Sequence, residues 1–278
     1  MRLPAHPSRL IALLGDPVRH SLSPVFQNAA IRAAGLDGIY MALRTDSESL
    51  PGLMRGIAMS GGGGNVTVPH KRLAATILDV ATGAVEKTGA CNTFWCEDGL
   101  LFGDNTDVAG FGEAVRALLG EEPRGARVLL IGAGGAARAV LCSLADSGAS
   151  RVDVINRTPE RATALAEQID TGGMVVAPIS RSLPDNETLA YDLVVNATSL
   201  GLNEGDADPV APHRLGSGTA ALDLVYRPGC TSWVKSLRAR GIRATDGTEM
   251  LVQQGAAAFV RWWGIPAPVE EMRVSLTD

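Results

Sequence analysis

The glycine-rich stretch Arg127–Val140, RVLLIGAGGAARAV, has the residue types and spacing of a site for phosphate groups. An apolar run of strand length ends at Ile131, the turn GAGGAA occupies residues 132–137, and a helical pattern of small residues follows. In a dinucleotide site the first glycine permits a tight turn and the second admits the pyrophosphate. A small third residue, here Ala137, lets the helix pack against its strand. The helix N-terminus then presents N–H groups to the phosphates. On this stretch alone, a glycine turn in another kind of α/β unit remains the alternative.

The end of the next expected strand, Asn156-Arg157-Thr158, bears on the choice between NAD and NADP. NAD sites usually place a carboxylate there, on the ribose 2′-OH, and this position has none. Arg157 carries a planar guanidinium suited to a 2′-phosphate, and Arg161, one helical turn later, adds a second cation. Asp153 lies inside the strand rather than at its end, so we exclude it as a ribose ligand. The pattern predicts NADP, with an exposed loop charge at Arg157 as the alternative.

A second group of polar residues lies in the N-terminal half, beginning with the loop GDPVRHSLSP. Ser23 is the expected N-cap of a helix that starts at Pro24, which explains it structurally. Ser21 has no such explanation, and two hydroxyls two residues apart beside a strand end suit a polyol ligand. The loop therefore predicts either a helix start alone or a binding site for a hydroxylated molecule.

Two further stretches place polar side chains at element ends. After a glycine run at 61–64, which we expect to be flexible, the segment NVTVPHK ends at Lys71; its alternation puts Asn65 and Thr67 on one face and Val66 and Val68 on the other. The segment DNTD ends at Asp107, just before an expected helix over 108–119. Asp107 is either a functional carboxylate or the cap of that helix.

Composition limits the class of protein. The chain has 278 residues, 46% of them hydrophobic and 20% charged, which is ordinary for a globular protein with one large core or two modest ones. A net charge of −5 gives no basic surface for nucleic acid. No apolar run approaches the ~20 residues of a membrane span. The four cysteines and four histidines are scattered, so we expect no metal site and a reducing cytoplasm.

The elements that must position these residues divide into two sets. The first half predicts strands at 10–14 and 39–43, helices at 24–35 and 47–59 (capped by Ser47), and a hairpin turning at 96–99. From residue 127, strands at 128–131, 152–155, 174–177, 193–196 and 220–225 alternate with helices, which predicts a parallel, doubly wound sheet. The polar stretch 121–125 is an expected hinge, and a last helix is expected to begin near Thr248.

Nine motifs occur in order along the chain: GDPVRHSLSP, NVTVPHK, GACNT, GDNTD, GAGGAARA, NRTPERA, NATSLG, DLVYRPGCT and DGTEMLVQQGAAAF. In this set the chain resembles the shikimate dehydrogenase family. The resemblance implies two α/β domains with a cleft between them: a substrate domain, residues 1–106 completed by the C-terminal helix 248–278, and a Rossmann NADP-binding domain, residues 107–247. It also implies reversible NADPH-dependent reduction of 3-dehydroshikimate to shikimate by a cytoplasmic enzyme of aromatic amino acid and chorismate biosynthesis.

The resemblance assigns roles to residues that match the family's motifs. Lys71 and Asp107 match its catalytic pair. The substrate-binding positions match Ser21, Ser23, Thr67, Asn92, Tyr226 and Gln254, although Gln253 makes that last register less secure. The cofactor positions are Gly132, Ala133, Gly134, Gly135, Ala136, Asn156, Arg157, Thr158, Arg161, Thr198, Leu224 and Gly247.

The chemistry of a ketone reduction agrees with these assignments. Negative charge grows on the ketone oxygen as hydride arrives, so a cation that can also give up a proton suits the site. Only three of the 25 Lys and Arg side chains are lysines, and one of them is Lys71. A guanidinium stays protonated, whereas an ammonium can exchange its proton. Asp107 would hold Lys71 in place and help to return that proton.

Two positions depart from the family pattern, and they leave alternatives open. Many members have His where this chain has Gln27, which resembles the quinate/shikimate branch, and many have Gly where it has Glu249. Quinate/shikimate or aminoshikimate dehydrogenase is therefore the nearest alternative. A non-catalytic nucleotide-binding regulator is an alternative of another class, which the presence of both Lys71 and Asp107 disfavours. The oligomeric state is not determined by the sequence, with a homodimer as the candidate assembly.

Overall fold

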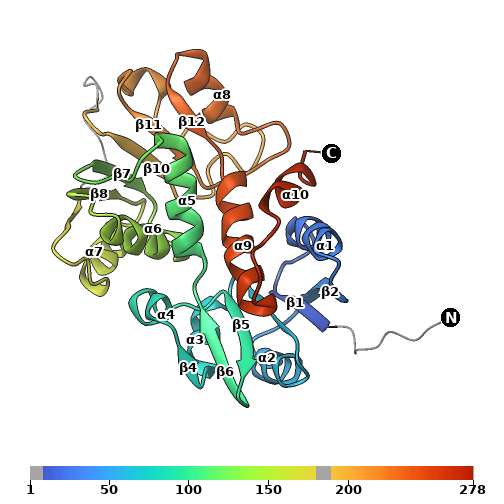
Figure 1. Ribbon diagram of the computed structural model, residues 1–278. Coiled ribbons are helices and arrows are strands. Elements are labelled where there is room, and N and C mark those ends of the chain that lie inside the picture. The colour runs from blue at the N-terminus through green and yellow to red at the C-terminus, as the bar shows by residue number, and fades with distance from the viewer. Residues whose placement is uncertain (1–8, 180–188, 278) are drawn as a thin grey trace. The chain divides into compact units, whose positions relative to one another are not determined.

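The computed structural model describes residues 9–179 and 189–277 and divides into two compact units (Figure 1). The first unit comprises Met1–Gly110 and Leu251–Asp278, and the second comprises Phe111–Met250. Both boundaries fall inside helices, α5 (Asp107–Leu119) and α9 (Thr248–Trp263). The predicted domain limits at 106/107 and 247/248 stay a prediction, and their outer limits, residues 1 and 278, lie outside the described residues.

The sheet of the first unit is mixed, with the strand order β2-β1-β3-β5-β6-β4. Its strands are β1 (Arg9–Gly15), β2 (Gly38–Arg44), β3 (Gly63–Val66), β4 (Val80–Ala81), β5 (Thr93–Glu97) and β6 (Leu100–Asp104). Strand β1 is parallel to β2 and β3, whereas β5 is antiparallel to both β3 and β6. The predicted hairpin is confirmed: Asp98 and Gly99 both have positive φ, as a tight two-residue turn between β5 and β6 requires.

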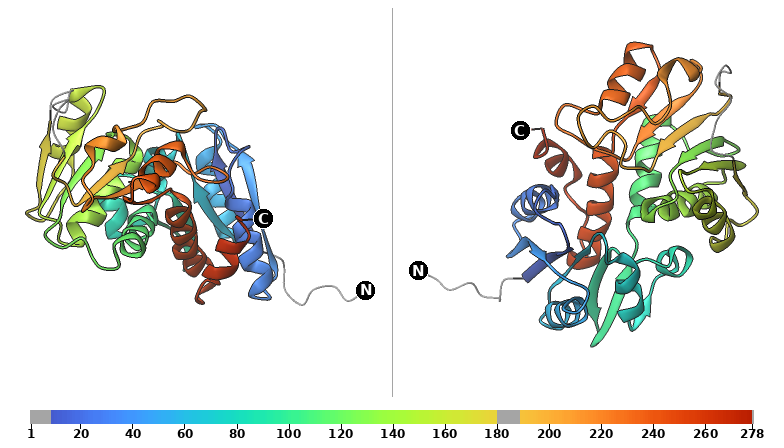
Figure 2. Two further views of the ribbon diagram at one scale, coloured as in Figure 1. Left: turned by 90° about the horizontal axis from the view of Figure 1, so that it is seen from above. Right: turned by 180° about the vertical axis from the view of Figure 1, so that it is seen from behind.

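Helices cover both faces of this sheet. Successive side chains of β1 point to opposite faces and so belong to two separate hydrophobic clusters. Ile11 and Leu13 pack with α1 (Ser23–Ala33), α9 and α10 (Val269–Val274), while Ala12 and Leu14 pack with α2 (Leu50–Met59) and α3 (Lys71–Ile77). Helix α4 (Gly83–Thr88) packs beside β4 and β6. The views in Figure 2 show α1 and α10 side by side on the first of these faces. Unlike the single helix expected at 248–278, the chain ends in two helices, separated after Trp263.

The glycine run at 61–64 is not the flexible segment that its composition predicts. Gly63 and Gly64 belong to β3, in the middle of the sheet, and both are buried. A Cβ on Gly64 would lie 2.2 Å from the carbonyl oxygen of Ala12, and one on Gly63 would lie 2.8 Å from that of Phe94. The glycines therefore allow β3 to approach its neighbours closely. The expected alternation also stops early, because β3 ends at Val66, which is buried, and Val68 is 62% exposed.

The sheet of the second unit is entirely parallel, with the order β12-β11-β10-β7-β8-β9. Its strands are β7 (Arg127–Ile131), β8 (Arg151–Ile155), β9 (Val175–Pro178), β10 (Leu193–Asn196), β11 (Ala220–Asp223) and β12 (Arg243–Thr245). Numbered within the unit and read from β9, the order is 3-2-1-4-5-6, that of dinucleotide-binding Rossmann folds. This confirms the predicted fold class of two α/β domains, one of them Rossmann.

The helices of the second unit are α6 (Gly135–Asp146), α7 (Pro159–Gln168) and α8 (Ser232–Ala239), with a short 3-10 turn at Pro212–Arg214. Leu129 and Val194 pack with α8, whereas Leu130 and Val195 are fully buried on the alternate face. A sheet that is covered on both faces needs apolar residues all along its strands. This explains why the strands could be predicted from continuous apolar runs in the sequence.

Two helix starts differ from their predictions. Ser23 is the first residue of α1 rather than its cap; instead its backbone N–H donates to Oγ of Ser21 at 3.2 Å. Helix α2 begins at Leu50 rather than at residue 47, because Asp46 accepts a hydrogen bond from the N–H of Ser49 at 2.8 Å and forms the turn before the helix.

Candidate functional site

Lys71 and Asp107 are in direct contact in the first unit. Lys71 is the first residue of α3 and Asp107 the first of α5, and Nζ donates to Oδ2 at 2.5 Å. Their side chains are 26% and 12% exposed, so the pair is reachable from solvent at one side. The second carboxylate oxygen accepts from Nδ2 of Asn92 at 2.8 Å. Both oxygens of Asp107 are thus directed at side chains of α3 and of the segment before β5, which favours the functional interpretation over a helix cap.

Asn92 is held so that its amide group points at Asp107. Its Oδ1 accepts from the backbone N–H of Thr106 at 2.8 Å and from Oγ1 of Thr93 at 2.9 Å. Because a backbone N–H can only donate, Oδ1 must face Thr106, and the NH₂ group then faces the carboxylate. Asn92 itself lies just before β5, tied to β6 by its N–H bond to the carbonyl of Asp104.

Two buried residues without a role predicted from the sequence, Asn65 and Tyr40, hold the segment of Asn92 and Thr93 in place through hydrogen bonds. Asn65 in β3 donates to the carbonyl of Asn92 at 3.0 Å and to Oγ1 of Thr93 at 2.9 Å. The hydroxyl of Tyr40, in β2, donates to Oδ1 of Asn65 at 2.7 Å. Burial raises the pKa of Tyr40, and a hydrogen bond with Ser23 acts in the opposite direction. The sequence alone could have identified Asn65 as a candidate, because it is a polar residue beside apolar ones. Nothing in the sequence around Tyr40 distinguishes it from an ordinary core residue.

Gln254, another predicted substrate residue of this unit, approaches Asn92. Gln254, on α9, has Oε1 3.5 Å from Nδ2 of Asn92, while its Nε2 donates to the carbonyl of Leu251 in its own helix. Thr67 follows β3 and packs against Gly15, where a Cβ would lie 2.4 Å from Cγ2 of Thr67. The loop GDPVRHSLSP, which contains Ser21 and Ser23, meets the NVTVPHK segment at the end of β1, where the N–H of Asp16 donates to the carbonyl of Val68 at 3.1 Å.

Tyr226, the remaining predicted substrate residue, belongs to the second unit and follows β11. Burial raises the pKa of its hydroxyl. Its role at the substrate stays a prediction.

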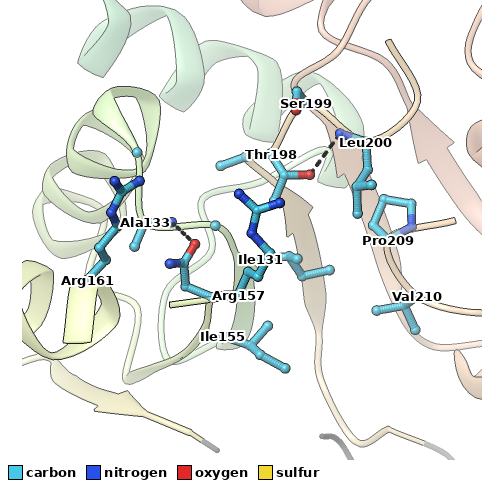
Figure 3. A pocket seen from close by; sticks show the side chains of 14 residues that line it. Ile131, Ala133, Ile155, Arg157, Arg161, Thr198, Ser199, Leu200, Pro209 and Val210 are labelled. Carbon is cyan, nitrogen blue, oxygen red and sulfur yellow. Dashed lines mark hydrogen bonds between the residues drawn. The ribbon is translucent and has the colours of Figure 1, made fainter. Parts of the chain in front are cut away.

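The second unit has a pocket of about 530 Å³ at the carboxyl ends of β7, β8 and β10 (Figure 3). It is lined by the predicted residues Gly132, Ala133, Gly134, Asn156, Arg157, Arg161 and Thr198. It is also lined by residues that the sequence analysis did not assign: Ile131, Ile155, Ala197, Ser199, Leu200, Pro209 and Val210. Gly135, Ala136, Thr158, Leu224 and Gly247 are not among the lining residues, and their predicted roles remain untested.

The backbone of the pocket fits a phosphate-containing ligand. Gly132 has a φ of +109°, and a Cβ there would lie 2.8 Å from the carbonyl oxygen of Ala197, so the fold itself requires glycine. Gly134 and Gly135 differ, because apart from their adjoining backbone no atom lies within 4 Å of where their Cβ would be. Their open space lies at the start of α6, where N–H groups and the helix dipole attract anions.

Charge in the pocket matches the same ligand. Arg157 and Arg161 both line it (Figure 3). The described lining includes no Asp or Glu. Asn156 joins the two loops, since its Oδ1 accepts from the N–H of Ala133 at 3.2 Å and its Nδ2 donates to the carbonyl of Thr158.

Leu224 and Gly247 adjoin each other at the ends of β11 and β12. A Cβ on Gly247 would lie 2.3 Å from the carbonyl oxygen of Leu224, and the N–H of Gly247 donates to the carbonyl of Val225 at 3.1 Å.

Among residues 9–179 and 189–277, no cluster of three His, Cys, Asp or Glu side chains could hold a metal ion. Nor does any helix in the described part of the chain have the length and apolar character needed to cross a membrane.

Comparison with known proteins places these features in one family. The substrate binding domain of shikimate dehydrogenase matches residues 13–94, the shikimate/quinate 5-dehydrogenase domain matches 115–202, and the shikimate 5′-dehydrogenase C-terminal domain matches 247–275. A protein of Moorella thermoacetica named shikimate dehydrogenase (NADP(+)) is 42% identical over 269 residues, covering 95% of this chain and 90% of its own.

Solved structures agree in fold over nearly the whole chain. Shikimate 5-dehydrogenase of Thermus thermophilus, in complex with NADP(H) and shikimate, superposes with a TM-score of 0.85 at 38% identity, over 96% of this chain and 98% of the other. Quinate dehydrogenase of Corynebacterium glutamicum, in complex with NAD, has a TM-score of 0.88 at 30% identity, again over 96% and 98%. With three matching domain models and relatives of this similarity, the chain belongs to the shikimate dehydrogenase family.

Proposed function

We propose that this chain catalyses the reversible NADP-dependent reduction of 3-dehydroshikimate to shikimate, with Lys71 and Asp107 as its acid–base pair. The observation that supports this most directly is the 2.5 Å contact between Nζ of Lys71 and Oδ2 of Asp107 within a cluster of neutral polar side chains. A binding module has no need of such a pair, which disfavours a non-catalytic regulator.

Lys71 acts at the oxygen of the ring ketone. A bound nicotinamide supplies the hydride. The ammonium of Lys71 stabilises the negative charge that develops on the ketone oxygen and gives it a proton. Asp107 then faces a neutral amine, and its carboxylate favours the return of a proton to Nζ. Asn92 keeps that carboxylate directed at Lys71 through its 2.8 Å bond to the other oxygen.

Neutral side chains recognise the rest of the substrate in this proposal. Hydroxyls of Ser21, Ser23 and Thr67 and the amides of Asn92 and Gln254 suit a small acid with several hydroxyls, because each can donate or accept as required. Gln254 has room to change partner, since its contacts to Asn92 and Thr106 are both 3.5 Å long. Tyr226 is proposed as a further substrate contact.

The cofactor proposal assigns the 2′-phosphate of NADP to Arg157 and Arg161 and the pyrophosphate to the turn 132–136. Asn156, Thr158, Thr198, Leu224 and Gly247 complete the proposed cofactor residues. Two cations beside a turn whose glycines leave open space form the observation that supports this assignment.

Quinate dehydrogenase is the second candidate, because a relative of that name shares the fold over 96% of this chain. Absorbance at 340 nm, with NADP or NAD against shikimate and quinate, separates the two. We expect shikimate with NADP to have much the highest kcat/KM. Equal or better turnover of quinate would contradict the proposal, and Gln27 would be the first residue to vary.

Three further aspects of the protein belong to the same proposal. We place it in the cytoplasm, without nucleic acid as a partner, on the basis of its net charge of −5 and its scattered cysteines. A homodimer is the proposed assembly. Light scattering coupled to gel filtration tests the assembly, and a mass equal to one 28.9 kDa chain would contradict it.

A further inference from the structure

The loop after β10 is wound around one buried side chain, that of Asn196. Its Oδ1 accepts from the N–H of Thr198 at 3.1 Å and from Oγ1 of Thr198 at 2.7 Å. Its Nδ2 donates to the carbonyl of Leu200 at 3.0 Å, and Oγ1 of Thr198 accepts from the N–H of Leu200 at 3.0 Å. Both ends of the loop are therefore fastened to a residue that is itself 0% exposed.

This loop supplies a wall of the cofactor pocket. Ala197, Thr198, Ser199 and Leu200 all line it, and Figure 3 shows the bond between Thr198 and Leu200 at its edge. The conformation of four lining residues thus depends on which way the amide of Asn196 points. A rotated amide would set its NH₂ group against the N–H of Thr198, where two donors meet and no bond forms.

Asp223, at the end of β11, determines the direction of that amide. Its Oδ1 accepts from Nδ2 of Asn196 at 2.8 Å, and a carboxylate offers no donor that would suit the opposite orientation. The same oxygen accepts from the N–H of Val225 at 3.1 Å, and Oδ2 accepts from Oγ1 of Thr231 at 2.8 Å. Asp223 thereby also holds the segment containing Leu224, a second proposed cofactor position.

The free-energy cost of burying the Asp223 carboxylate indicates that this residue has a role other than stabilising the fold. Asp223 is 0% exposed, and the ion pairs found in the described part of the chain do not include it. Burial raises the pKa of its carboxyl, and the hydrogen bonds from Thr231, Val225 and Asn196 only partly offset that effect. A buried, unpaired carboxylate is expensive, and here its three acceptor bonds set the geometry of two loops.

We propose that Asp223 and Asn196 are positioning residues for NADP, which order the loop 197–200 and the segment 224–225 before the cofactor binds. The proposal rests on the proposed function of the pocket as the NADP site. Neither side chain lines the pocket, so neither is expected to touch the cofactor. Their effect should appear in NADP affinity and in the order of the empty loop, while shikimate binding in the first unit is unaffected.

The test compares Asp223→Asn with a matched control, Asp153→Asn. Asp153 is also a buried strand carboxylate of the same sheet, 4% exposed, but it is bonded to Arg151 and Tyr191 and does not line the pocket. Affinity for NADP is measured by titration calorimetry at a temperature where wild type and both variants are folded. Exchange of the amide hydrogens of 197–200 is measured in the protein without cofactor.

We expect Asp223→Asn to weaken NADP binding roughly tenfold, the size of one hydrogen bond to a charged group, and to speed exchange at 197–200. Asp153→Asn should leave both within about twofold of wild type. The KM for shikimate should be unchanged in both variants. If Asp223→Asn does not fold, Thr231→Val removes one of the three bonds to Asp223, and a smaller change in the same two measurements is expected.

Wild-type affinity and wild-type exchange in Asp223→Asn would overturn the inference. Equal losses in Asp153→Asn would also overturn it, since they would show a general effect of disturbing the sheet. A wild-type protein that does not bind NADP contradicts the proposed function instead, and the exchange measurement then decides by itself whether Asp223 orders the loop.

Discussion

At the scale of single residues, the contrast between Lys71 and Arg157 is one of chemistry. Lys71 contacts the carboxylate of Asp107 at 2.5 Å, and its proposed role is to exchange a proton with the substrate. Arg157 lines a pocket whose described residues include a second arginine and no carboxylate, and its proposed role is a fixed positive charge for a 2′-phosphate. The two cations should therefore respond differently to substitution.

Lys71→Ala should lower kcat by roughly 10²–10⁴-fold, the usual contribution of a positioned acid–base group, with a smaller change in the KM for shikimate. Lys71→Arg should recover little of this loss, because a guanidinium keeps its proton. Initial rates with saturating NADP test both variants, and calorimetry should find NADP affinity unchanged. If Lys71→Ala raised only KM, Lys71 would be a binding cation and the proton would have another source.

Arg157→Ala should reduce the preference for NADP over NAD by about tenfold to a hundredfold, because a charge-assisted bond to a 2′-phosphate contributes about 1.5–3 kcal/mol. The change should appear mainly in the KM for NADP, with the kcat for shikimate little altered. Steady-state kinetics with both cofactors measures it. A variant with the wild-type ratio would show that Arg157 does not contact the 2′-phosphate.

At the scale of elements, the strand β3 shows how glycine can serve packing rather than mobility. Its backbone lies between β1 and β5, and it carries the chain directly into the segment that ends at Lys71. A Cβ on Gly64 would lie 2.2 Å from the carbonyl oxygen of Ala12 and 2.7 Å from Cζ of Phe94. The position of Lys71 is thus linked to the close approach of these strands.

Gly64→Ala should lower the free energy of unfolding by about 1–3 kcal/mol, as overpacking of a core does, and should lower kcat through displacement of the Lys71 segment. Gly56→Ala is the control: Gly56 is exposed in helix α2 with no atom within 4 Å of its Cβ position, so alanine should stabilise by about 1 kcal/mol. Urea denaturation measures both. Equal stability of the two variants would contradict the packing argument.

At the scale of the whole molecule, the residues proposed for the cofactor lie in the second unit, and those proposed for the substrate, apart from Tyr226, lie in the first. NADP should slow amide hydrogen exchange within the described residues of Phe111–Met250, most strongly at 131–134 and 197–200. Shikimate alone should slow it in the first unit, around Ser21, Thr67 and Asn92. At a hundred times its Kd, each ligand should stabilise its own unit by about 2.7 kcal/mol. Protection by NADP centred on the first unit would contradict the assignment.

Some features of this protein follow from local sequence alone. The strand at 193–196 has the predicted limits, because its apolar run lies entirely within the element. The parallel arrangement of the second sheet follows from alternating strands and helices, since parallel neighbours need a crossover connection between them. The glycine turn at 132–137 could be predicted for a similar reason, because the strand, the turn and the helix start that form it follow one another in the chain.

Other features were decided only by tertiary contacts. The burial of Gly63 and Gly64 depends on β1 and β5, and the tie between Tyr40 and Asn65 spans 25 residues. Asp107 had two local interpretations, and the functional one depends on Lys71, 36 residues earlier in the chain. In the same way, the sequence around Asp223 indicates only the end of a strand. Its hydrogen bond with Asn196 forms because β10 and β11 pair side by side. Spacing within a segment reports local conformation, whereas the partner of a buried polar group is set by which strands become neighbours.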